Sequence, residues 1–276
     1  MIGPRVRKAL RKLLRVVADH DPAYYDMYAD RNEALFAQLY LLRILRHAEA
    51  SGIRPPARVL DAGCQAGRLA IPLAARGFAV TGVDTSAFAL RRARRHAQAA
   101  GVPARWMRGD MARVLAGRAQ SFDLAVCAEV LYLSPRYRGT LATLARAVRP
   151  GGLVCVSHRP LLYYLYEALR RQDVPGALSV LQRREGACGG AAYVNWQTEE
   201  ELRALYDEVG LTWVAHYPID RVAWLTGMDV SKLSGAEQDA WLELELGLEA
   251  GEAMCARYAL VIAARPADGG EREGRG

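Results

Sequence analysis

Lysine is nearly missing from this 276-residue sequence. Its only lysines are Lys8, Lys12 and Lys232, and the rest of its 37 cationic side chains are arginines. The cations exceed the 30 acidic side chains and give a formal net charge of +7. That excess is modest for this length, and no basic motif interleaved with aromatic residues occurs, so we do not expect a nucleic-acid partner. Six of the cations fall within residues 1–20. We interpret them as a solvated basic segment, with a polyanion site as the alternative.

Cysteine is also sparse. The five cysteines are Cys64, Cys127, Cys155, Cys188 and Cys255. They are widely spaced and odd in number, and none forms a C-x-x-C pair or lies at zinc-site spacing from a histidine. The sequence therefore predicts neither a disulfide framework nor a metal site.

Long apolar runs are absent as well. No stretch of eighteen apolar residues occurs, so no membrane span is expected. Residues 1–19 carry scattered cations and no separate apolar core, unlike a secretory signal. With 51% hydrophobic residues the chain is too apolar to be disordered, and we expect a cytoplasmic globular protein.

From residue 58 onward, short apolar strands alternate with amphipathic helices, a pattern typical of βαβ units. The expected strands span residues 58–60, 78–83, 104–107, 123–128, 153–157, 211–217 and 256–264. Ser86 and Thr198 are expected to cap the helices that follow them. The predicted fold class is α/β: a Rossmann-like, mostly parallel seven-stranded sheet with helices on both faces.

Several segments lie outside this alternation. We expect residues 1–56 to form a helical cap or lid, residues 57–265 the main domain, and residues 266–276 a flexible tail. Insertions at 160–197 and 218–254 interrupt the main domain. Substrate selection is commonly built into such insertions on a regular scaffold.

A glycine-bearing turn follows the first expected strand. Asp61, Gly63 and Gly67 surround Gln65 there, and the next strand ends at Asp84. Glycines let the backbone approach a ligand closely, and an acid at that strand end can accept hydrogen bonds from ribose hydroxyls. The spacing departs from G-x-G-x-x-G, which disfavours an NAD-dependent oxidoreductase.

Three later motifs occur in matching order. They are Gly-Asp-Met at 109–111, the fourth-strand segment 122–131 and the Arg-Pro-Gly-Gly-Leu turn at 149–153. With the glycine turn, they make residues 58–157 resemble class I S-adenosylmethionine-dependent methyltransferases. One departure is Gln65, where that family usually has glycine.

The resemblance implies S-adenosyl-L-methionine as cofactor and assigns its site. The cofactor-binding residues it implies are Arg31, Asp61, Gly63, Gln65, Gly67, Asp84, Thr85, Asp110, Met111 and Ala128. Asp61 would hold the amino group, Asp84 the ribose, and Asp110 with Met111 the adenine. The alternatives are that Asp61 caps the turn and that Asp110 caps the following helix.

Residues 24–31 are rich in aromatics and resemble the N-terminal lid helix of small-molecule methyltransferases, including glycine N-methyltransferase-like enzymes. By that likeness Tyr24 and Tyr28 would contact substrate, and Arg31 would pair with the cofactor carboxylate. The alternative for Arg31 is a surface arginine beside Asp30.

Polar residues also follow the fourth and fifth expected strands. Because ligands bind at the carboxyl ends of strands in open α/β sheets, His158 and Arg159 are expected to face substrate. His158 is a candidate base and Arg159 a candidate anchor for an anionic group; Glu129 and Tyr132 complete the catalytic candidates. The alternative for His158 is a histidine satisfied by hydrogen bonds at the strand end.

The predicted function is methyl transfer from S-adenosyl-L-methionine to a nitrogen or oxygen, less favourably a carbon, of a small molecule. One alternative is a methyltransferase of RNA or another macromolecule that uses the basic N-terminal segment. Another is a cofactor-binding protein without activity. The sequence leaves open the acceptor, the oligomeric state (a homodimer is one option) and the use of a general base.

Overall fold

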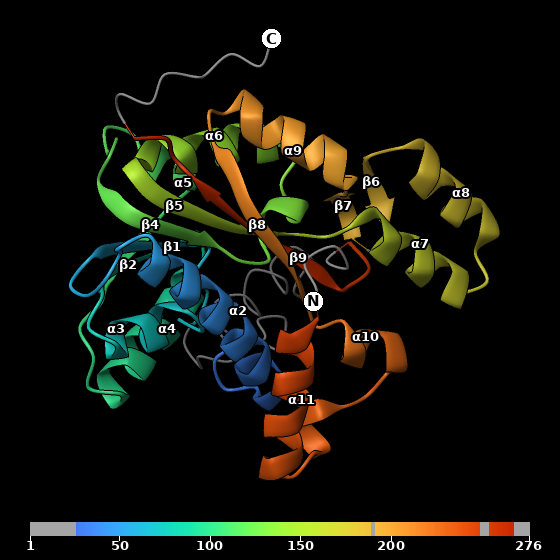
Figure 1. Ribbon diagram of the computed structural model, residues 1–276, viewed down its shortest axis with the longest axis horizontal. Helices are drawn as coiled ribbons and strands as arrows, with labels where there is room; N and C mark the ends of the chain where they lie inside the picture. The colour runs from blue at the N-terminus through green and yellow to red at the C-terminus, as the bar shows by residue number, and fades with distance from the viewer. Residues whose placement is uncertain (1–25, 189–190, 249–253, 268–276) are drawn as a thin grey trace, which may run out of the picture.

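A central sheet of seven strands organises the computed structural model, which describes residues 26–188, 191–248 and 254–267 (Figure 1). In spatial order the strands are β3 (Arg105–Arg108), β2 (Ala79–Asp84), β1 (Arg58–Ala62), β4 (Phe122–Cys127), β5 (Val148–His158), β9 (Tyr258–Ala264) and β8 (Thr212–Ile219). Strands β1 to β5 pair in parallel, whereas β9 runs antiparallel to both β5 and β8. The expected mostly parallel seven-stranded sheet is confirmed.

Helices cover both faces of this sheet. They are α2 (Arg31–Ala50), α3 (Ala70–Ala75), α4 (Ala87–Ala99), α5 (Met111–Val114), α6 (Tyr137–Ala147) and α9 (Glu199–Glu208), with the 3-10 turn η1 (Leu131–Leu133). Both predicted caps are present: the Ser86 hydroxyl accepts the Ala89 N–H at 3.2 Å, and Thr198 forms a capping box with Glu201. Figure 1 shows α6 and α9 on one side of the sheet and α2 to α4 on the other.

Alternate residues of the same strands enter two separate cores. Leu153 and Cys155 of β5 belong to the core beneath α2 and α3, whereas Val154 and Val156 belong to the core beneath α6 and α9. This is the two-residue period of a strand buried on both faces. The same parity decides where the polar residues at the end of β5 point.

The first insertion builds a unit beside the sheet. It contains α7 (Leu161–Arg170), α8 (Val174–Gln182) and an antiparallel hairpin of β6 (Glu185–Cys188) and β7 (Ala191–Asn195). The sequence did not predict this hairpin, because its strands are short and glycine-rich. The Trp196 indole N–H donates to the Val180 carbonyl at 3.0 Å and ties the hairpin to α8.

The second insertion packs on α2. It contains α10 (Val222–Thr226), η2 (Val230–Lys232) and α11 (Gly235–Gly247). Buried Arg43 of α2 donates to the Leu246 carbonyl at 2.6 Å, and Phe36 lies edge-on to Trp241 with ring centroids 6.0 Å apart. These contacts therefore hold the second insertion on α2.

Two further expectations bear on the described residues. No helix within them is both long and apolar enough to cross a membrane. They also contain no group of three or more His, Cys, Asp or Glu side chains placed to hold a metal ion. Cys64, Cys127, Cys155 and Cys255 are free thiols.

Candidate functional site

A cavity of about 620 Å³ opens where β1, β2 and β4 end, and we call it the sheet-edge cavity. It brings together most of the predicted cofactor and catalytic residues. These are Asp61, Gly63, Gln65, Asp84, Thr85, Asp110, Met111, Ala128, Glu129 and Tyr132. Such a volume suits a small-molecule or cofactor site.

The glycine turn is fastened to the neighbouring strand. The N–H groups of Gly63 and Cys64 both donate to the Val83 carbonyl, at 2.8 and 3.0 Å. Gly63 has φ +83°, and a Cβ there would lie 2.3 Å from Cγ2 of Val130. Glycine is therefore required at this position both by the backbone conformation and by the close approach of Val130.

We expect Gly63→Ala to lower the free energy of unfolding by about 2–4 kcal/mol, from left-handed strain plus overpacking. Gly101→Ala is the matched control, because Gly101 has φ +66° but nothing within 4 Å of its would-be Cβ. The loss of unfolding free energy in the control variant therefore measures the left-handed backbone strain alone, about 1–2 kcal/mol. Urea denaturation of both variants measures the difference, and equal losses would contradict the role of Val130.

Gln65 occupies a left-handed position with φ 44°. Its backbone N–H donates to Asp84 Oδ2 at 3.0 Å, and its side-chain Oε1 accepts the Met27 N–H at 3.2 Å. Since Met27 also lines the sheet-edge cavity, Gln65 ties the segment before α2 to the glycine turn. The hydrogen bond to Met27 thus explains why glutamine occupies this position, where the sequence motif usually has glycine.

Asp84 is half-buried and held in one orientation. Its Oδ1 accepts the Ser86 N–H at 2.7 Å and its Oδ2 accepts the Gln65 N–H at 3.0 Å. Each carboxylate oxygen can accept more than one hydrogen bond. The carboxylate is therefore oriented by the backbone while retaining capacity for two ligand hydroxyls.

Asp61 presents a buried carboxylate to the same cavity. The residue is 3% exposed, and burial raises its pKa to about 7, with Arg68 only partly offsetting that effect. Its Oδ2 is buried and has no hydrogen-bond partner among the described residues. A buried acceptor of this kind needs a donor, and a cationic ligand group would satisfy it.

Asp110 caps a helix at the sheet-edge cavity. Its Oδ1 accepts the Ala112 N–H at 3.0 Å and so caps α5, while its Oδ2 lies 3.3 Å from Arg136 Nη2. The residue also lines the cavity, beside Met111. The helix cap therefore explains why an aspartate stands here, and the same residue also borders the cavity.

Arg68 is a site residue that sequence reasoning missed. It is 6% exposed, lines the sheet-edge cavity, and pairs with Glu33 of α2 and with Glu129, the latter at 2.7 Å. Arg68 keeps the pKa of Glu129 below its ordinary value despite burial. A signal was present, because Arg68 is the only charged residue between Asp61 and Arg76.

The structure corrects the expectation that His158 faces substrate. His158 is 1% exposed, lies 2.9 Å from the Tyr206 hydroxyl through Nε2, and does not line the sheet-edge cavity. Burial lowers its pKa to about 3, so the imidazole is neutral. His158 shares the strand parity of Val154 and Val156 and therefore points into the core beneath α9.

The N-terminal candidates are also placed differently. Arg31 is exposed at the first position of α2 and does not line the sheet-edge cavity. Tyr28 stacks on His96 with ring centroids 4.4 Å apart. Gly67, with φ +94°, shapes the turn without lining the cavity, and Tyr24 lies outside the described residues.

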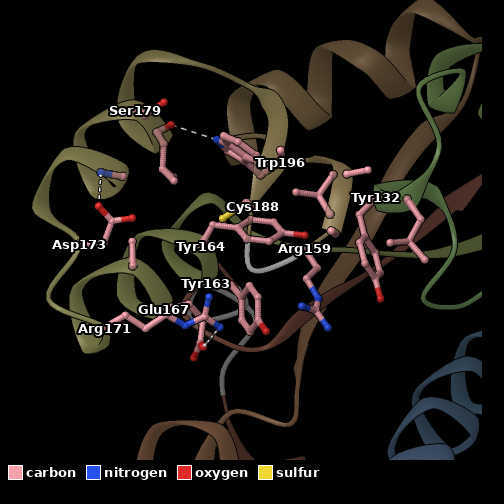
Figure 2. A pocket seen from close by; sticks show the side chains of 18 residues that line it. Tyr132, Arg159, Tyr163, Tyr164, Glu167, Arg171, Asp173, Ser179, Cys188 and Trp196 are labelled. Atoms are coloured by element: carbon pink, nitrogen blue, oxygen red, sulfur yellow. Dashed lines mark hydrogen bonds and ion pairs between the residues drawn. The ribbon is translucent and has the colours of Figure 1, made fainter. Parts of the chain in front are cut away.

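A second cavity, of about 700 Å³, is enclosed mainly by the first insertion, and we call it the insertion cavity (Figure 2). Tyr132 and Leu133 line both cavities, so the two spaces adjoin. Arg159 lines the insertion cavity, and Figure 2 shows its side chain between Tyr132 and Tyr163. A ligand in one cavity can thus approach a ligand in the other at Tyr132.

Known sequences resemble the part of the chain that forms the sheet-edge cavity. Residues 59–152 match a family model described as a methyltransferase domain. A ubiquinone biosynthesis O-methyltransferase of Aromatoleum aromaticum is 35% identical over 156 residues, which cover 56% of this chain and 63% of that relative. One from Methylocella silvestris is 40% identical over 97 residues, 35% of this chain and 38% of the relative. The chain thus spans less than two thirds of either relative.

Solved structures resemble the chain over more of its length. A 1,6-didemethyltoxoflavin-N1-methyltransferase of Burkholderia thailandensis has a TM-score of 0.57 at 20% identity and covers 96% of this chain and 92% of its own. A magnesium protoporphyrin IX methyltransferase of Synechocystis has a TM-score of 0.56 at 18% identity, with coverages of 88% and 90%. At these identities the likeness concerns the fold.

Proposed function

We propose that this chain, whose residues 59–152 match a methyltransferase domain, transfers a methyl group from S-adenosylmethionine to a small molecule. The observation that carries the proposal is the pair of carboxylates at the glycine turn. Asp61 has a buried, unpartnered oxygen, and Asp84 is oriented by two backbone N–H groups. The named activity of the relatives favours an oxygen as the methyl acceptor.

The residues of the sheet-edge cavity fit this cofactor group by group. Asp61 Oδ2 would accept from the cofactor ammonium, and the Asp84 carboxylate would accept from both ribose hydroxyls. Met111 would pack on the adenine at the far side of the cavity. Gly63 keeps the backbone clear of the methionine portion.

The cofactor would supply a sulfonium methyl that is already activated, so the protein contributes mainly position. The insertion cavity would hold the acceptor, and Tyr132, at the junction, would orient it toward the methyl group. Burial raises the pKa of Tyr132, which keeps its hydroxyl protonated as a donor. Glu129 is held ionised by Arg68 and would accept a hydrogen bond beside the transferred methyl group.

The relatives' names support a small-molecule acceptor over the two alternatives, an RNA methyltransferase and a cofactor-binding protein without activity. The basic segment on which the RNA alternative rests lies outside the described residues. Cytoplasmic location and a homodimer remain predictions from the sequence.

The test is transfer of labelled methyl from S-adenosylmethionine to a panel of small phenols and catechols. We expect label in product with the wild-type chain and none with Gly63→Val, which fills the turn with a side chain. The parallel control is Gly101→Val, because Gly101 does not line the cavity. Binding of S-adenosylhomocysteine without turnover on any acceptor would favour the cofactor-binding alternative, and no binding would refute the proposal.

The raised pKa of Asp61 predicts a pH dependence of cofactor binding. With a pKa of about 7, the carboxyl is largely protonated at pH 5.5 and ionised at pH 8. Since only the ionised form attracts an ammonium group, we expect affinity for S-adenosylhomocysteine to fall with decreasing pH below 7, approaching about tenfold per pH unit. Calorimetry between pH 5.5 and 7.5 measures this, and Asp61→Asn should give weaker binding without that slope.

A further inference from the structure

Arg159 is a largely buried cation without an acidic partner among the residues that the structure describes. Its Nη2 donates to the Tyr258 hydroxyl at 2.7 Å, whereas its Nε is buried and finds no hydrogen-bond partner in the described part of the chain. No described carboxylate lies within ion-pair distance of its guanidinium. A buried charge normally requires an opposite charge nearby, so Arg159 has an unmet need for an anion.

Two other arginines, buried Arg68 and half-buried Arg257, do have acidic partners. Arg68 pairs with Glu33 and Glu129, and Arg257 lies 3.0 Å from Asp220. Buried Arg43 instead donates to the backbone carbonyls of Glu245 and Leu246, so the chain itself supplies the acceptors of these three guanidinium groups. At Arg159 it supplies aromatic rings instead.

Three tyrosines surround the Arg159 guanidinium. Its central carbon lies 4.1 Å from the Tyr163 ring centroid and 4.7 Å from those of Tyr132 and Tyr258. Cation–π contacts of this kind are attractive but leave the net charge in place. The rings hold the guanidinium in one position, which prepares it to bind an anion with little loss of side-chain entropy.

The acidic side chains that line the insertion cavity are already engaged elsewhere. Glu167 pairs with Arg170 at 2.9 Å and Arg171 at 3.6 Å, and Asp173 caps α8 through the Gly176 N–H at 2.9 Å. Arg159 does not line the sheet-edge cavity, so the cofactor's own carboxylate is not its counterpart. Since no residue that the structure describes supplies the anion, we assign that role to a ligand of the insertion cavity.

The remaining walls favour a flat, unsaturated ligand. Tyr164 and Trp196 line the cavity with ring centroids 5.1 Å apart, and Tyr163 stands at 83° to Tyr164 with centroids 5.0 Å apart. Offset and edge-to-face contacts with such rings stabilise an aromatic guest. Resting on the proposed function, we infer that the methyl acceptor is an aromatic compound with a carboxylate, which Arg159 binds while the acceptor hydroxyl lies at Tyr132.

The experiment compares two probes of nearly equal shape, 3,4-dihydroxybenzoate and its neutral amide, 3,4-dihydroxybenzamide. Their binding to the full chain saturated with S-adenosylhomocysteine is measured by calorimetry. We expect the benzoate to bind at least tenfold more tightly than the amide. Arg159→Gln should abolish this preference and Arg159→Lys should retain part of it. Arg171→Gln is the matched control and should keep the preference, because Arg171 lines the same cavity but already pairs with Glu167.

Equal binding of the two probes by the wild-type chain would overturn the inference without any variant. A preference that survives Arg159→Gln would overturn it as well, as would failure of the wild-type chain to bind either probe. Affinity for S-adenosylhomocysteine alone, measured on every variant, separates these results from failure of the proposed function. If the wild-type chain does not bind S-adenosylhomocysteine, the proposed function itself is rejected.

Discussion

Replacing Asp84 with alanine is expected to weaken S-adenosylhomocysteine binding by at least about 100-fold. Two hydrogen bonds from ribose hydroxyls to a carboxylate contribute about 1.5–3 kcal/mol each, and about 1.4 kcal/mol corresponds to tenfold in affinity. The variant also releases the N–H groups of Gln65 and Ser86, which the carboxylate accepts at 3.0 and 2.7 Å. Calorimetric titration measures the loss.

Asp110→Ala is the control for that experiment. Asp110 lines the same cavity, but its side chain is 42% exposed and serves as a helix cap and a partner of Arg136. We expect less than about a tenfold loss there, since a solvated carboxylate contributes little to affinity. Equal losses in the two variants would contradict the assignment of the ribose to Asp84.

Arg68→Met is expected to lower the free energy of unfolding by about 3–5 kcal/mol. The substitution preserves the apolar stem but leaves the carboxylates of Glu33 and Glu129 buried without their shared cation. Urea denaturation at pH 8 measures the loss. The control is Arg138→Met, which breaks an exposed pair with Glu208 and should change stability by less than about 1 kcal/mol.

The pH dependence of the Arg68→Met deficit tests its cause. Without Arg68, burial should raise the folded-state pKa of Glu129 above its unfolded value, so the folded variant binds protons more readily than the unfolded chain. Stability of the variant then falls as pH rises. We therefore expect the deficit to be larger at pH 8 than at pH 5. A deficit that does not change with pH would indicate lost packing instead.

Sequence reasoning succeeded where the determining contacts are local. The turn at Gly63 follows β1, and Asp84 ends β2. The alternation of strands and helices predicts that these two strands pair in parallel, and this pairing brings the turn and the carboxylate together. Helix caps at Ser86 and Thr198 likewise depend on residues three positions away. Local chemistry of this kind is readable without tertiary information.

It failed where partners come from distant segments. Arg68 meets Glu33 and Glu129 across 35 and 61 positions, and Arg159 meets Tyr258 across 99. The error at His158 had a different origin. The strand-end rule identifies an edge of the sheet, but the two-residue alternation along β5 turns His158 into the core and leaves the next residue, Arg159, at the insertion cavity.

The sheet, the glycine turn and the carboxylates that flank it follow from the amino-acid sequence, because hydrophobic period, turn chemistry and strand-end position are properties of neighbouring residues. Three features require the folded structure: which buried charges are neutralised, the contact of Gln65 with Met27, and the arginine among three tyrosines at a second cavity. Those outcomes depend on contacts between segments far apart in the chain, and no local pattern encodes which of many possible partners will meet.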